Sequence, residues 1–552
     1  MKKRILALIL ALAMVFALAA CGGGEQGGGT GTSATNTGTP STEAPENSGG
    51  APTELRVGMT TSMGDLSPFG YSSVGRNQIR YWIYEYVAIF TEFGQTWEEM
   101  EWQLAKNIEQ VDSLTYTIEL YDYIVDAIGN PVKASDVAFC FNEVAAAGIV
   151  SRATTYLEAA TPLDEVTVEI KLKTDIVGAL EYLVTQVPIV SEKTYNEHQD
   201  QMTTLPITTA AYQITESVDG SYMLFEKNDN YWQTDESVRS IYAQQPVETI
   251  RYLIIPEASQ AVIALQTGEV DMLASLAGND LSYFINADGT NVDGFNSSFV
   301  QDSKPVDLVF NMSEGPEGDL FRDNLPLRQA IFHAINPDDV VAIACDGRAE
   351  VIHDLGMNTC GDYSPEWDDE PYFDYDLDLA KELLAEAGYP DGKKDGKQLT
   401  IRLICATAYD DAAQVIQGQL VQLGIEVSLQ VLDDAMFSTL QMDPTSWDIW
   451  LDKKGNEGYI TGTYDNIMLQ NKEGVGARNF IVDDKLESLL VAAHNISTHT
   501  KDAMDELHYY VVDNAIARGI YVPYVYSVSR EGITPYLHPW GFLCPNVSTF
   551  TG

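Results

Sequence analysis

Apolar and polar residues alternate along several short segments of the chain, which is the period of a half-buried β-strand. Residues 116–120 and 166–172 both follow this pattern. Residues 248–255 are more uniformly apolar, which is typical of a strand in the middle of a sheet. The pattern therefore predicts central strands together with strands that face solvent on one side.

Longer segments have helical periodicity and end at glycines. A glycine directly after the last helical residue suits the left-handed conformation that ends many helices. Three such helices are residues 259–267, 377–387 and 411–423, followed by Gly268, Gly388 and Gly424. Ser135 and Asn324 are the predicted N-caps of two further helices, which run through Val144 and Ile335.

Two stretches have the strand–helix–strand order of a βαβ unit, which connects parallel strands. The first covers residues 250–273 and the second covers residues 399–431. Two α/β lobes so far apart in the chain predict a cleft between them, because ligands of α/β proteins bind at carboxyl ends of strands and at domain interfaces.

The first 21 residues have the pattern of a secretory signal peptide. A basic start is followed by the apolar residues 5–17, a run shorter than the roughly 20 residues that a membrane span needs. Residues 18–21 read Leu-Ala-Ala-Cys and resemble a bacterial lipobox. We expect residues 1–20 to be removed and Cys21 to be lipidated, which would anchor the protein on the outer face of the cytoplasmic membrane. An ordinary signal peptide with a stray cysteine is the alternative.

Composition separates a tether from a globular part. Residues 21–52 are rich in Gly, Ser and Thr, bury little apolar surface and are expected to be a disordered tether. About 500 residues remain, which is enough for two or three domains. The formal charge of −49 disfavours nucleic acid and anionic lipid as partners. A solvated acidic surface explains this charge more simply than a dedicated site for cations.

Five cysteines follow Cys21, an odd number, so at least one has no partner within the chain. Cys140 and Cys405 lie in apolar patterns and are predicted to be buried thiols. Cys345 and Cys360 could form a disulfide across a loop, and the sequence leaves this open.

Short motifs in a fixed order run through most of the chain. They lie at residues 104–109, 114–120, 133–139, 225–232, 265–271, 327–335 and 380–388. In these motifs the chain resembles the bacterial extracellular solute-binding proteins of family 5, the oligopeptide-, dipeptide- and nickel-binding receptors of ABC importers. Residues 129–131 and 208–212 depart from the family pattern, since the second stretch lacks two glycines of a family turn.

The resemblance implies an α/β fold, a two-lobed flytrap of the periplasmic-binding-protein type (type II-like) with an inserted subdomain in the first lobe. By analogy, the first lobe consists of residues 53–88, 206–305 and 513–552. The insert is residues 89–205 and the second lobe is residues 306–512.

The resemblance also implies where a ligand binds. Peptide-binding members anchor the ligand amine with an aspartate, and an ungapped alignment over residues 447–460 places Glu457 at that position. Lys454 then replaces a tryptophan, and with Lys453 it favours an anionic ligand if both face the cleft. The further candidates in this stretch are Trp450, Asn456 and Tyr459.

The opposing wall is expected near residues 70–84. Ser72, Ser73 and Val74 could offer backbone hydrogen bonds to an extended peptide, and Tyr71 beside them is a further candidate for ligand contact. The helix that follows carries Asn77, Tyr81 and Trp82, whose side chains are candidates for ligand contact. The aromatic rings could stack on a sugar or an aromatic side chain, although such rings more often belong to a core.

The rival interpretation is a secreted enzyme. The sequence contains no HExxH, GxSxG or Walker motif, and His494 and His499 have the wrong spacing for a zinc protease pair. We therefore expect a monomeric binding protein without cofactor or metal, whose closed form delivers a peptide to the subunits of a membrane permease. An oligosaccharide, a metal chelate or a small anion is the alternative ligand.

Overall fold

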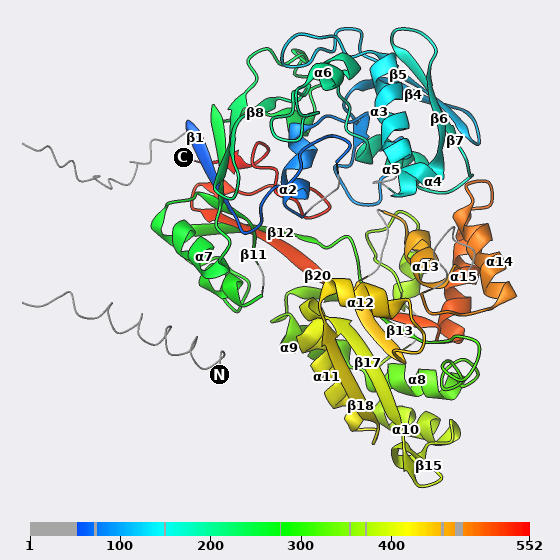
Figure 1. The fold of residues 1–552 in the computed structure, drawn as a ribbon. Helices are drawn as coiled ribbons and strands as arrows, with labels where there is room; N and C mark the ends of the chain where they lie inside the picture. Colours follow the sequence, from blue (N-terminus) through cyan, green and yellow to red (C-terminus); the bar gives the residue numbers. More distant parts are fainter. Residues whose placement is uncertain are drawn as a thin grey trace, which may run out of the picture. The chain divides into compact units, whose positions relative to one another are not determined.

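The structure, a computed structural model, describes residues 52–70, 74–147, 151–276, 278–352, 355–369, 373–453, 458–469 and 478–551. These residues form a mixed α/β fold (Figure 1). Within the described ranges, no helix combines the length and the apolar character that crossing a bilayer requires. The predicted signal peptide, Cys21 and nearly all of the tether lie outside these ranges.

One sheet of 12 strands organises the fold, in the order β18-β17-β19-β13-β20-β11-β1-β10-β9-β8, with β12 and β14 also paired to β20. Its strands are β1 (Glu54–Met59), β8 (Tyr212–Val218), β9 (Tyr222–Lys227), β10 (Thr249–Ile254), β11 (Met272–Leu276), β12 (Phe295–Gln301), β13 (Val306–Phe310), β14 (Ala349–Val351), β17 (Thr400–Ala406), β18 (Glu426–Leu432), β19 (Ile449–Lys453) and β20 (Ala517–Arg530). The first half of β20 pairs with β13 and β14, and its second half pairs with β11 and β12 (Figure 1). This strand therefore joins two groups of strands.

The group beside the amino-terminal strand confirms the first βαβ prediction. Strand β1 is parallel to both β10 and β11 and lies between them. Helix α7 (Ala258–Thr267) connects β10 to β11 and ends at Gly268, whose φ of 76° is left-handed as predicted. Strand β10 also pairs with β9, so its predicted central place is correct.

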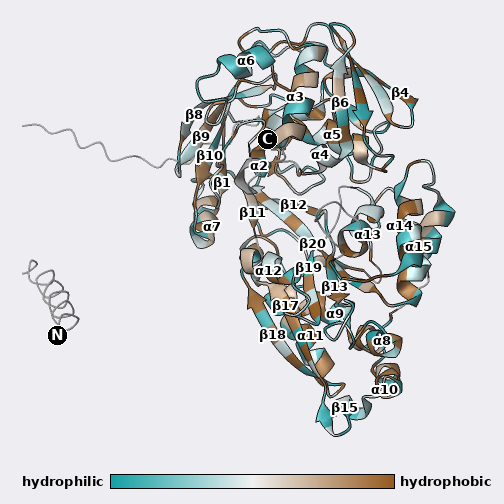
Figure 2. Cartoon of the chain, turned by 45° about the vertical axis from the view of Figure 1, so that its right-hand side comes forward, coloured by the Kyte–Doolittle hydropathy of each residue, from teal (hydrophilic) through white to brown (hydrophobic). Residues whose placement is uncertain are grey.

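The other group confirms the second βαβ prediction. Strands β17 and β18 are parallel neighbours, and helix α11 (Asp410–Val421) connects them. Gly424 has a φ of 80°, as its predicted helix-ending role requires. Helix α8 (Leu325–Ala334) begins after Asn324, whose side chain accepts a hydrogen bond from Leu327 N, so this predicted N-cap is confirmed. Figure 2 shows hydrophobic residues along β17 and β18.

A separate sheet of four strands lies within the predicted insert, in the order β4-β5-β7-β6. It contains β4 (Ala105–Asp112), β5 (Thr115–Leu120), β6 (Leu157–Pro162) and β7 (Thr167–Leu172). The inward side chains of β5 and β7 alternate with more exposed ones, as their sequences predict.

The predicted N-cap at Ser135 is wrong, because Ser135 lies inside helix α3 (Ala134–Ala147), which begins at the preceding residue. Asp136, in the first turn, is the side chain that binds backbone N–H groups at the start of this helix. Its carboxylate accepts hydrogen bonds from the backbone N–H groups of Lys133 and Glu192, both at 2.7 Å. A carboxylate inside the first turn can satisfy such free N–H groups as well as a true N-cap does.

The remaining longer helices are α2 (Val74–Ile83), α5 (Ala179–Gln186), α9 (Pro337–Ala344), α10 (Leu377–Glu386), α12 (Asp434–Gln441), α13 (Ile460–Met468), α14 (Asp484–His494) and α15 (Lys501–Asp513). Helix α10 is followed by Gly388 at a φ of 91°, again as predicted. Buried apolar side chains form one core around β1, β10 and the insert and another between Val306 and Val522. The second core also contains residues between Ala515 and Val522, which the resemblance assigns to the first lobe, and the lobe boundaries stay a prediction.

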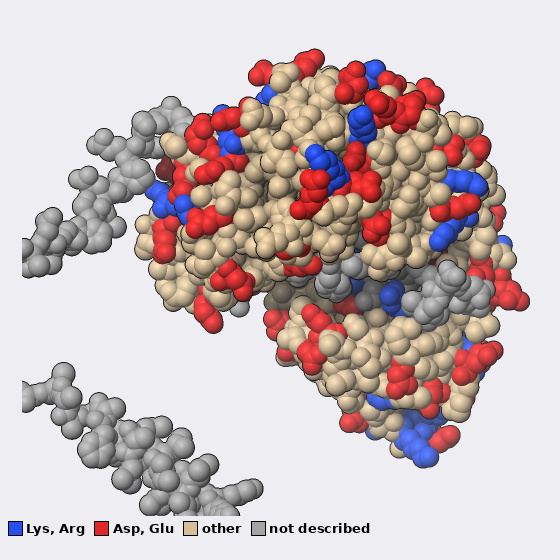
Figure 3. Space-filling view, turned by 45° about the horizontal axis from the view of Figure 1, so that its top comes forward, with Lys and Arg blue, Asp and Glu red and all other residues tan. Residues whose placement is uncertain are grey.

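The five cysteines of the described part are all free thiols, which answers the question left open for Cys345 and Cys360. Cys140 and Cys405 are buried, as predicted. The surface is acidic, as 81 Asp and Glu against 32 Lys and Arg require, and carboxylates are spread over the face drawn in Figure 3.

Candidate functional site

The predicted anchor stretch begins on β19, a strand inside the sheet. Strand β19 is antiparallel to β13 and parallel to β17. Trp450 has 0% of its surface exposed and belongs to the core of the second lobe. Its indole N–H donates to the carbonyl of Arg478. The structure therefore places this proposed ligand residue inside the protein.

Lys453 ends β19 and forms an ion pair with Asp302, which follows β12. The side chain of Lys453 is 34% exposed and that of Asp302 is 15% exposed. An internal carboxylate therefore neutralises the charge that the sequence analysis assigned to an anionic ligand. Six other predicted ligand residues lie outside the described part of the chain. They are Tyr71, Ser72, Ser73, Lys454, Asn456 and Glu457.

Val74 begins α2, and the structure describes its backbone alone. The aromatic side chains of this helix are buried. Trp82 is 1% exposed and packs against Phe225 and Tyr252, with ring centroids 4.8 and 6.1 Å away. Tyr81 is 2% exposed and stacks on His538 at 4.4 Å. These are core positions, the ordinary role of large aromatic rings. Asn77 is half-buried.

Tyr459 is the predicted residue that contacts the insert. It is 6% exposed, and its hydroxyl donates to Glu181 Oε1 of α5 at 3.3 Å. A Cβ added to Gly178, directly before α5, would lie 3.0 Å from Cδ2 of the Tyr459 ring. The start of α5 and the stretch after β19 are therefore in tight contact, although they belong to different predicted lobes.

Glu181 is a buried carboxylate at this contact, with 6% of its surface exposed. Its Oε1 also accepts a hydrogen bond from the backbone N–H of Trp97 at 3.2 Å. Burial raises the pKa of Glu181, while the hydrogen bonds from Trp97 and Tyr459 act in the opposite direction. No Lys or Arg within the described ranges forms an ion pair with it.

Three glycines bring backbone segments together at the same contact. A Cβ on Gly94 would lie 2.5 Å from the carbonyl oxygen of Thr359, and a Cβ on Gly361 would lie 2.5 Å from that of Gly94. Gly361 N donates to the carbonyl of Gly458 at 2.8 Å. The backbone approaches too closely for a side chain at Gly94 and Gly361, whereas Gly458 is explained by its φ of 104°, which L side chains rarely adopt.

A second set of hydrogen bonds joins the loop before α5 to the end of α14. Val177 N donates to the carbonyl of His494 at 2.9 Å. Asp175 accepts from Ile496 N through its carbonyl and from Ser497 N through Oδ2 at 3.2 Å. The predicted insert thus contacts the predicted second lobe through α5 and the segment before it.

Asp362 fixes the start of α13, directly after Tyr459. Its carboxylate accepts hydrogen bonds from Ile460 N at 2.6 Å and Thr461 N at 3.1 Å. Burial raises the pKa of Asp362, and these two hydrogen bonds lower it. The sequence analysis missed Asp362, Glu181 and Gly178, because each acts on a residue far away in the chain.

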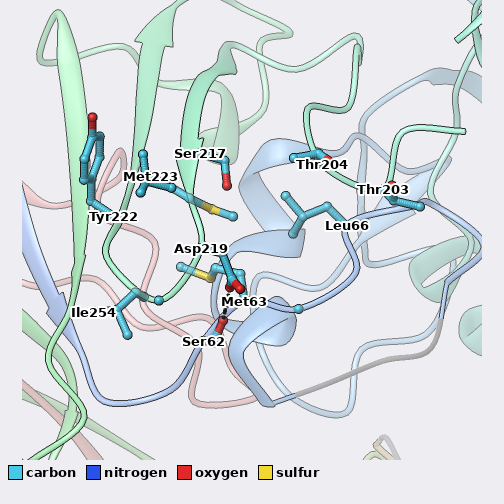
Figure 4. A pocket seen from close by; sticks show the side chains of 13 residues that line it. Ser62, Met63, Leu66, Thr203, Thr204, Ser217, Asp219, Tyr222, Met223 and Ile254 are labelled. Carbon is cyan, nitrogen blue, oxygen red and sulfur yellow. Dashed lines mark hydrogen bonds between the residues drawn. The ribbon is translucent and has the colours of Figure 1, made fainter. Parts of the chain in front are cut away.

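A cavity of about 360 Å³ lies elsewhere, between the segment after β1 and the β8–β9 turn (Figure 4). Met63, Leu66 and Met223 line it together with Ser62 and Asp219, whose side chains are 3.5 Å apart. None of the predicted ligand residues lines this cavity. The described residues contain no group of three or more His, Cys, Asp or Glu side chains suited to a metal ion.

Comparison with known proteins identifies the family. Residues 99–471, more than half of the chain, match the model of the middle part of the bacterial extracellular solute-binding proteins, family 5. The oligopeptide-binding protein AppA of Bacillus subtilis is 27% identical over 376 residues, which cover 62% of this chain and 63% of AppA. The nickel-binding periplasmic protein of Escherichia coli is 24% identical over 421 residues, covering 71% of this chain and 74% of that protein.

Solved structures share the fold. The complex of Bacillus subtilis AppA with a nonapeptide has a TM-score of 0.67 and 19% identity, covering 90% of this chain and 99% of that one. HbpA2 of Haemophilus parasuis has a TM-score of 0.75 at 19% identity, covering 90% and 100% of the two chains. The two-lobed flytrap prediction is therefore confirmed at the level of the fold. The chain belongs to family 5 of the bacterial extracellular solute-binding proteins.

Proposed function

We propose that this protein is the solute-binding component of an ABC importer, which captures a peptide between its lobes and delivers it to a membrane permease. The observation that carries this proposal is the contact of Tyr459 with Gly178 and Glu181. This contact joins the insert to the stretch that aligns with the ligand anchor of peptide-binding relatives. The oligopeptide-binding relative favours a peptide over other solutes.

The mechanism is ligand-dependent closure. A ligand that touches both lobes stabilises the closed form by the difference between its affinities for the closed and open forms. Strands β12 and β20 connect the two groups of strands and are the segments whose backbone angles would change. Within the cleft, Glu457 would bind the peptide amine, and the backbone of residues 72–74 would pair with the peptide.

We place the protein outside the cytoplasmic membrane, held there by lipid on Cys21. In this proposal it works as a monomer, needs no cofactor and catalyses no reaction. The permease and its ATP-hydrolysing subunits drive transport.

A metal chelate is the second candidate ligand, because the nickel-binding protein of Escherichia coli is among the relatives. Such a ligand would carry its own donor atoms, so the protein would need to recognise only the chelator.

Native mass spectrometry tests the proposal. The purified protein is measured before and after incubation with a mixed pool of tri- to hexapeptides. We expect a set of peptide masses on the folded protein, whose lengths report the preferred ligand. A mass that stays unchanged with peptides but increases with a nickel chelate would contradict the peptide proposal and support the second candidate.

A further inference from the structure

The contact between the predicted insert and the predicted second lobe covers a carboxyl group. Glu181 lies in the first turn of α5. Its Oε1 accepts hydrogen bonds from the backbone N–H of Trp97 at 3.2 Å and from the hydroxyl of Tyr459 at 3.3 Å. Trp97 belongs to the same predicted insert as Glu181, whereas Tyr459 belongs to the predicted second lobe. One of these two hydrogen bonds therefore depends on the contact between the lobes.

The ring of Tyr459 also shields Glu181 from water. This ring lies against Gly178, the residue before α5, since a Cβ there would be 3.0 Å from its Cδ2. Residues three apart at the start of a helix lie on the same side, so the ring and its hydroxyl cover the side of α5 from Gly178 to Glu181. Glu181 and Tyr459 are both buried. When the second lobe moves away, Tyr459 leaves with it, and the carboxyl group meets solvent on this side.

The titratable groups that the described neighbours turn toward Glu181 are acids. Glu98, in the segment that carries Trp97, acts on it with a like charge that raises the pKa of Glu181. Burial, followed by the charge of Glu181, raises the pKa of Tyr116 on β5 to about 12 and also raises that of Tyr459. Both tyrosines are therefore neutral near pH 7. The further charged groups that act on these two tyrosines are Glu98, Glu99, Asp112, Asp175 and Asp362.

The imidazole at this contact belongs to His494, which has another carboxylate partner. His494 ends α14, and its carbonyl accepts the hydrogen bond from Val177 N ahead of α5. Its side chain forms an ion pair with Asp465 of α13. No Lys or Arg in the described part of the chain pairs with Glu181. A negative charge on Glu181 therefore has no described cation to compensate it.

Burial without a counter-ion disfavours the ionised form of a carboxyl group. This effect raises the pKa of Glu181, although the hydrogen bonds from Trp97 and Tyr459 lower it. When the lobes separate, water reaches the group and its pKa returns toward the ordinary value near 4.3. The closed form thus binds a proton more tightly than the open form. This proton stabilises closure as the pH falls through the raised pKa, and the stabilisation is lost as the pH rises above it.

We propose that closure of the two lobes is coupled to the uptake of a proton by Glu181, so that the protein holds its solute more tightly in acid than at neutral pH. This inference rests on the closure mechanism of the proposed function and adds its regulation. The proton comes from solvent when the lobes close and returns to solvent when they open. Both hydrogen bonds end on Oε1, so a proton on Oε2 leaves them in place.

Small-angle scattering of the ligand-free full chain at pH 5.0 and pH 7.0 tests the coupling without any ligand. We expect a larger radius of gyration at pH 7.0, because fewer molecules are closed. Glu181→Gln keeps the hydrogen-bonding oxygen but cannot titrate, so this difference should disappear. Glu101→Gln is the matched control and should keep it. Burial also raises the pKa of Glu101, but its carboxylate binds Ile241 N and joins the insert to the first lobe.

Titration calorimetry with a bound peptide from the mixed pool measures the same coupling as an affinity. From pH 5.0 to pH 7.0, the parent protein should lose roughly threefold more affinity than Glu181→Gln does. Comparison with this variant cancels the titration of the peptide itself. Tyr459→Phe keeps the ring but removes the hydrogen bond that favours the ionised carboxylate, so it should enlarge the pH dependence. This variant keeps the test valid if Glu181→Gln fails to fold.

The possible failures differ from one another. The coupling is overturned when neither the radius of gyration nor the affinity depends more on pH in the parent than in Glu181→Gln. A pH dependence of Tyr459→Phe that does not exceed that of the parent overturns it as well. When no peptide binds but the pH-dependent change in radius is lost in Glu181→Gln, the peptide function is contradicted and the coupling is supported.

Discussion

Glu85 illustrates how a single residue connects motifs that are distant in the sequence. It follows α2 and is 3% exposed. Its Oε1 accepts from the hydroxyl of Tyr231 at 2.5 Å, and its Oε2 accepts from the indole N–H of Trp232 at 2.7 Å. Both partners belong to the motif at residues 225–232 that carried part of the family resemblance. Burial raises the pKa of Glu85 to about 7, although both hydrogen bonds lower it.

A raised pKa means that the ionised form of Glu85 opposes folding at alkaline pH. The carboxyl group of Glu85 has a pKa of about 7 in the native protein, whereas a glutamate in the unfolded chain has a pKa near 4.3. Stability from this group is therefore gained as the pH falls from about 7 toward 4.3 and is absent above 7. We expect Glu85→Gln to be less destabilising at pH 8.5 than at pH 5.5, by roughly 2 kcal/mol, because only the interval between pH 5.5 and the native pKa of about 7 contributes. Urea denaturation at the two pH values measures the difference. A cost of Glu85→Gln that does not depend on pH would show that Glu85 has an ordinary pKa.

Glu457 is the residue on which the amine-anchor proposal depends. Removing a carboxylate from a buried charge pair weakens binding by about 2 kcal/mol or more. We expect Glu457→Ala to reduce the affinity for a free-amine peptide by that amount and to leave its N-acetylated copy unaffected. Titration calorimetry with both forms checks this. Equal losses for the two forms would assign Glu457 a different role.

At the scale of elements, the start of α5 decides how closely the insert approaches the second lobe. Gly178 has a φ of 79° and leaves no space for a side chain beside Tyr459. The loop before it binds the end of α14 through backbone hydrogen bonds. A small change at this end of α5 would therefore separate the lobes without disturbing either core.

Gly178→Ala tests this role, and Gly129→Ala is its control. Both glycines have left-handed backbone angles, 79° and 85°, so alanine strains both in the same way. A Cβ at Gly129 meets nothing within 4 Å, whereas one at Gly178 meets the Tyr459 ring at 3.0 Å. We expect similar small losses of stability, but a reduced peptide affinity in Gly178→Ala alone. Small-angle scattering with bound peptide should then show a more open Gly178→Ala protein. Equal affinities of the two variants would mean that this contact does not contribute to closure.

Helix ends and other structural features that depend only on residues close together in the sequence could be predicted from the sequence. The helix ends at Gly268 and Gly424 needed only a left-handed residue after a helical pattern. Ser135 is not the cap because α3 already begins at Ala134, and Asp136 in its first turn accepts the hydrogen bond from Lys133 N. Sequence pattern alone does not distinguish these two side chains.

The interlobe contact could not be predicted in this way. Tyr459 and Glu181 are 278 positions apart, and Asp362 is 98 positions from the N–H group of Ile460. The alignment with peptide-binding relatives pointed to Tyr459, but nothing in the sequence indicated its partner. The ion pair of Lys453 with Asp302 was missed for the same reason, since it joins residues 151 positions apart.

At the scale of the whole molecule, a buried imidazole makes stability sensitive to acid. His508 on α15 has 0% of its surface exposed and stacks on Trp367 at 4.1 Å with an interplanar angle of 3°. Its Nδ1 lies 3.3 Å from the hydroxyl of Tyr464. Burial lowers the pKa of His508 to about 4, although the charge of Asp505 raises it.

The native pKa of His508 is below the value of about 6.5 for an unfolded histidine. As the pH falls from 6.5 to 4, the unfolded chain binds a proton that the native protein does not, so stability decreases by on the order of 3 kcal/mol. We expect His508→Phe, which retains a ring against Trp367, to lose less stability than the parent protein over this range. Urea denaturation at pH 7.5 and pH 4.5 measures both losses. Identical losses would show that His508 is protonated in the folded protein.

Strand β20 has a consequence for the order in which the molecule can be built. It spans Ala517–Arg530 in a chain of 552 residues and lies between β13 and β11 in the sheet. Strand β20 follows the other eleven strands of this sheet in chain order, so a ribosome releases it after all the strands with which it pairs. Until then, β13 and β11 each lack a neighbour, and each half of the sheet presents an open edge. A premature stop before Ala517 would therefore deprive both groups of strands of their shared strand.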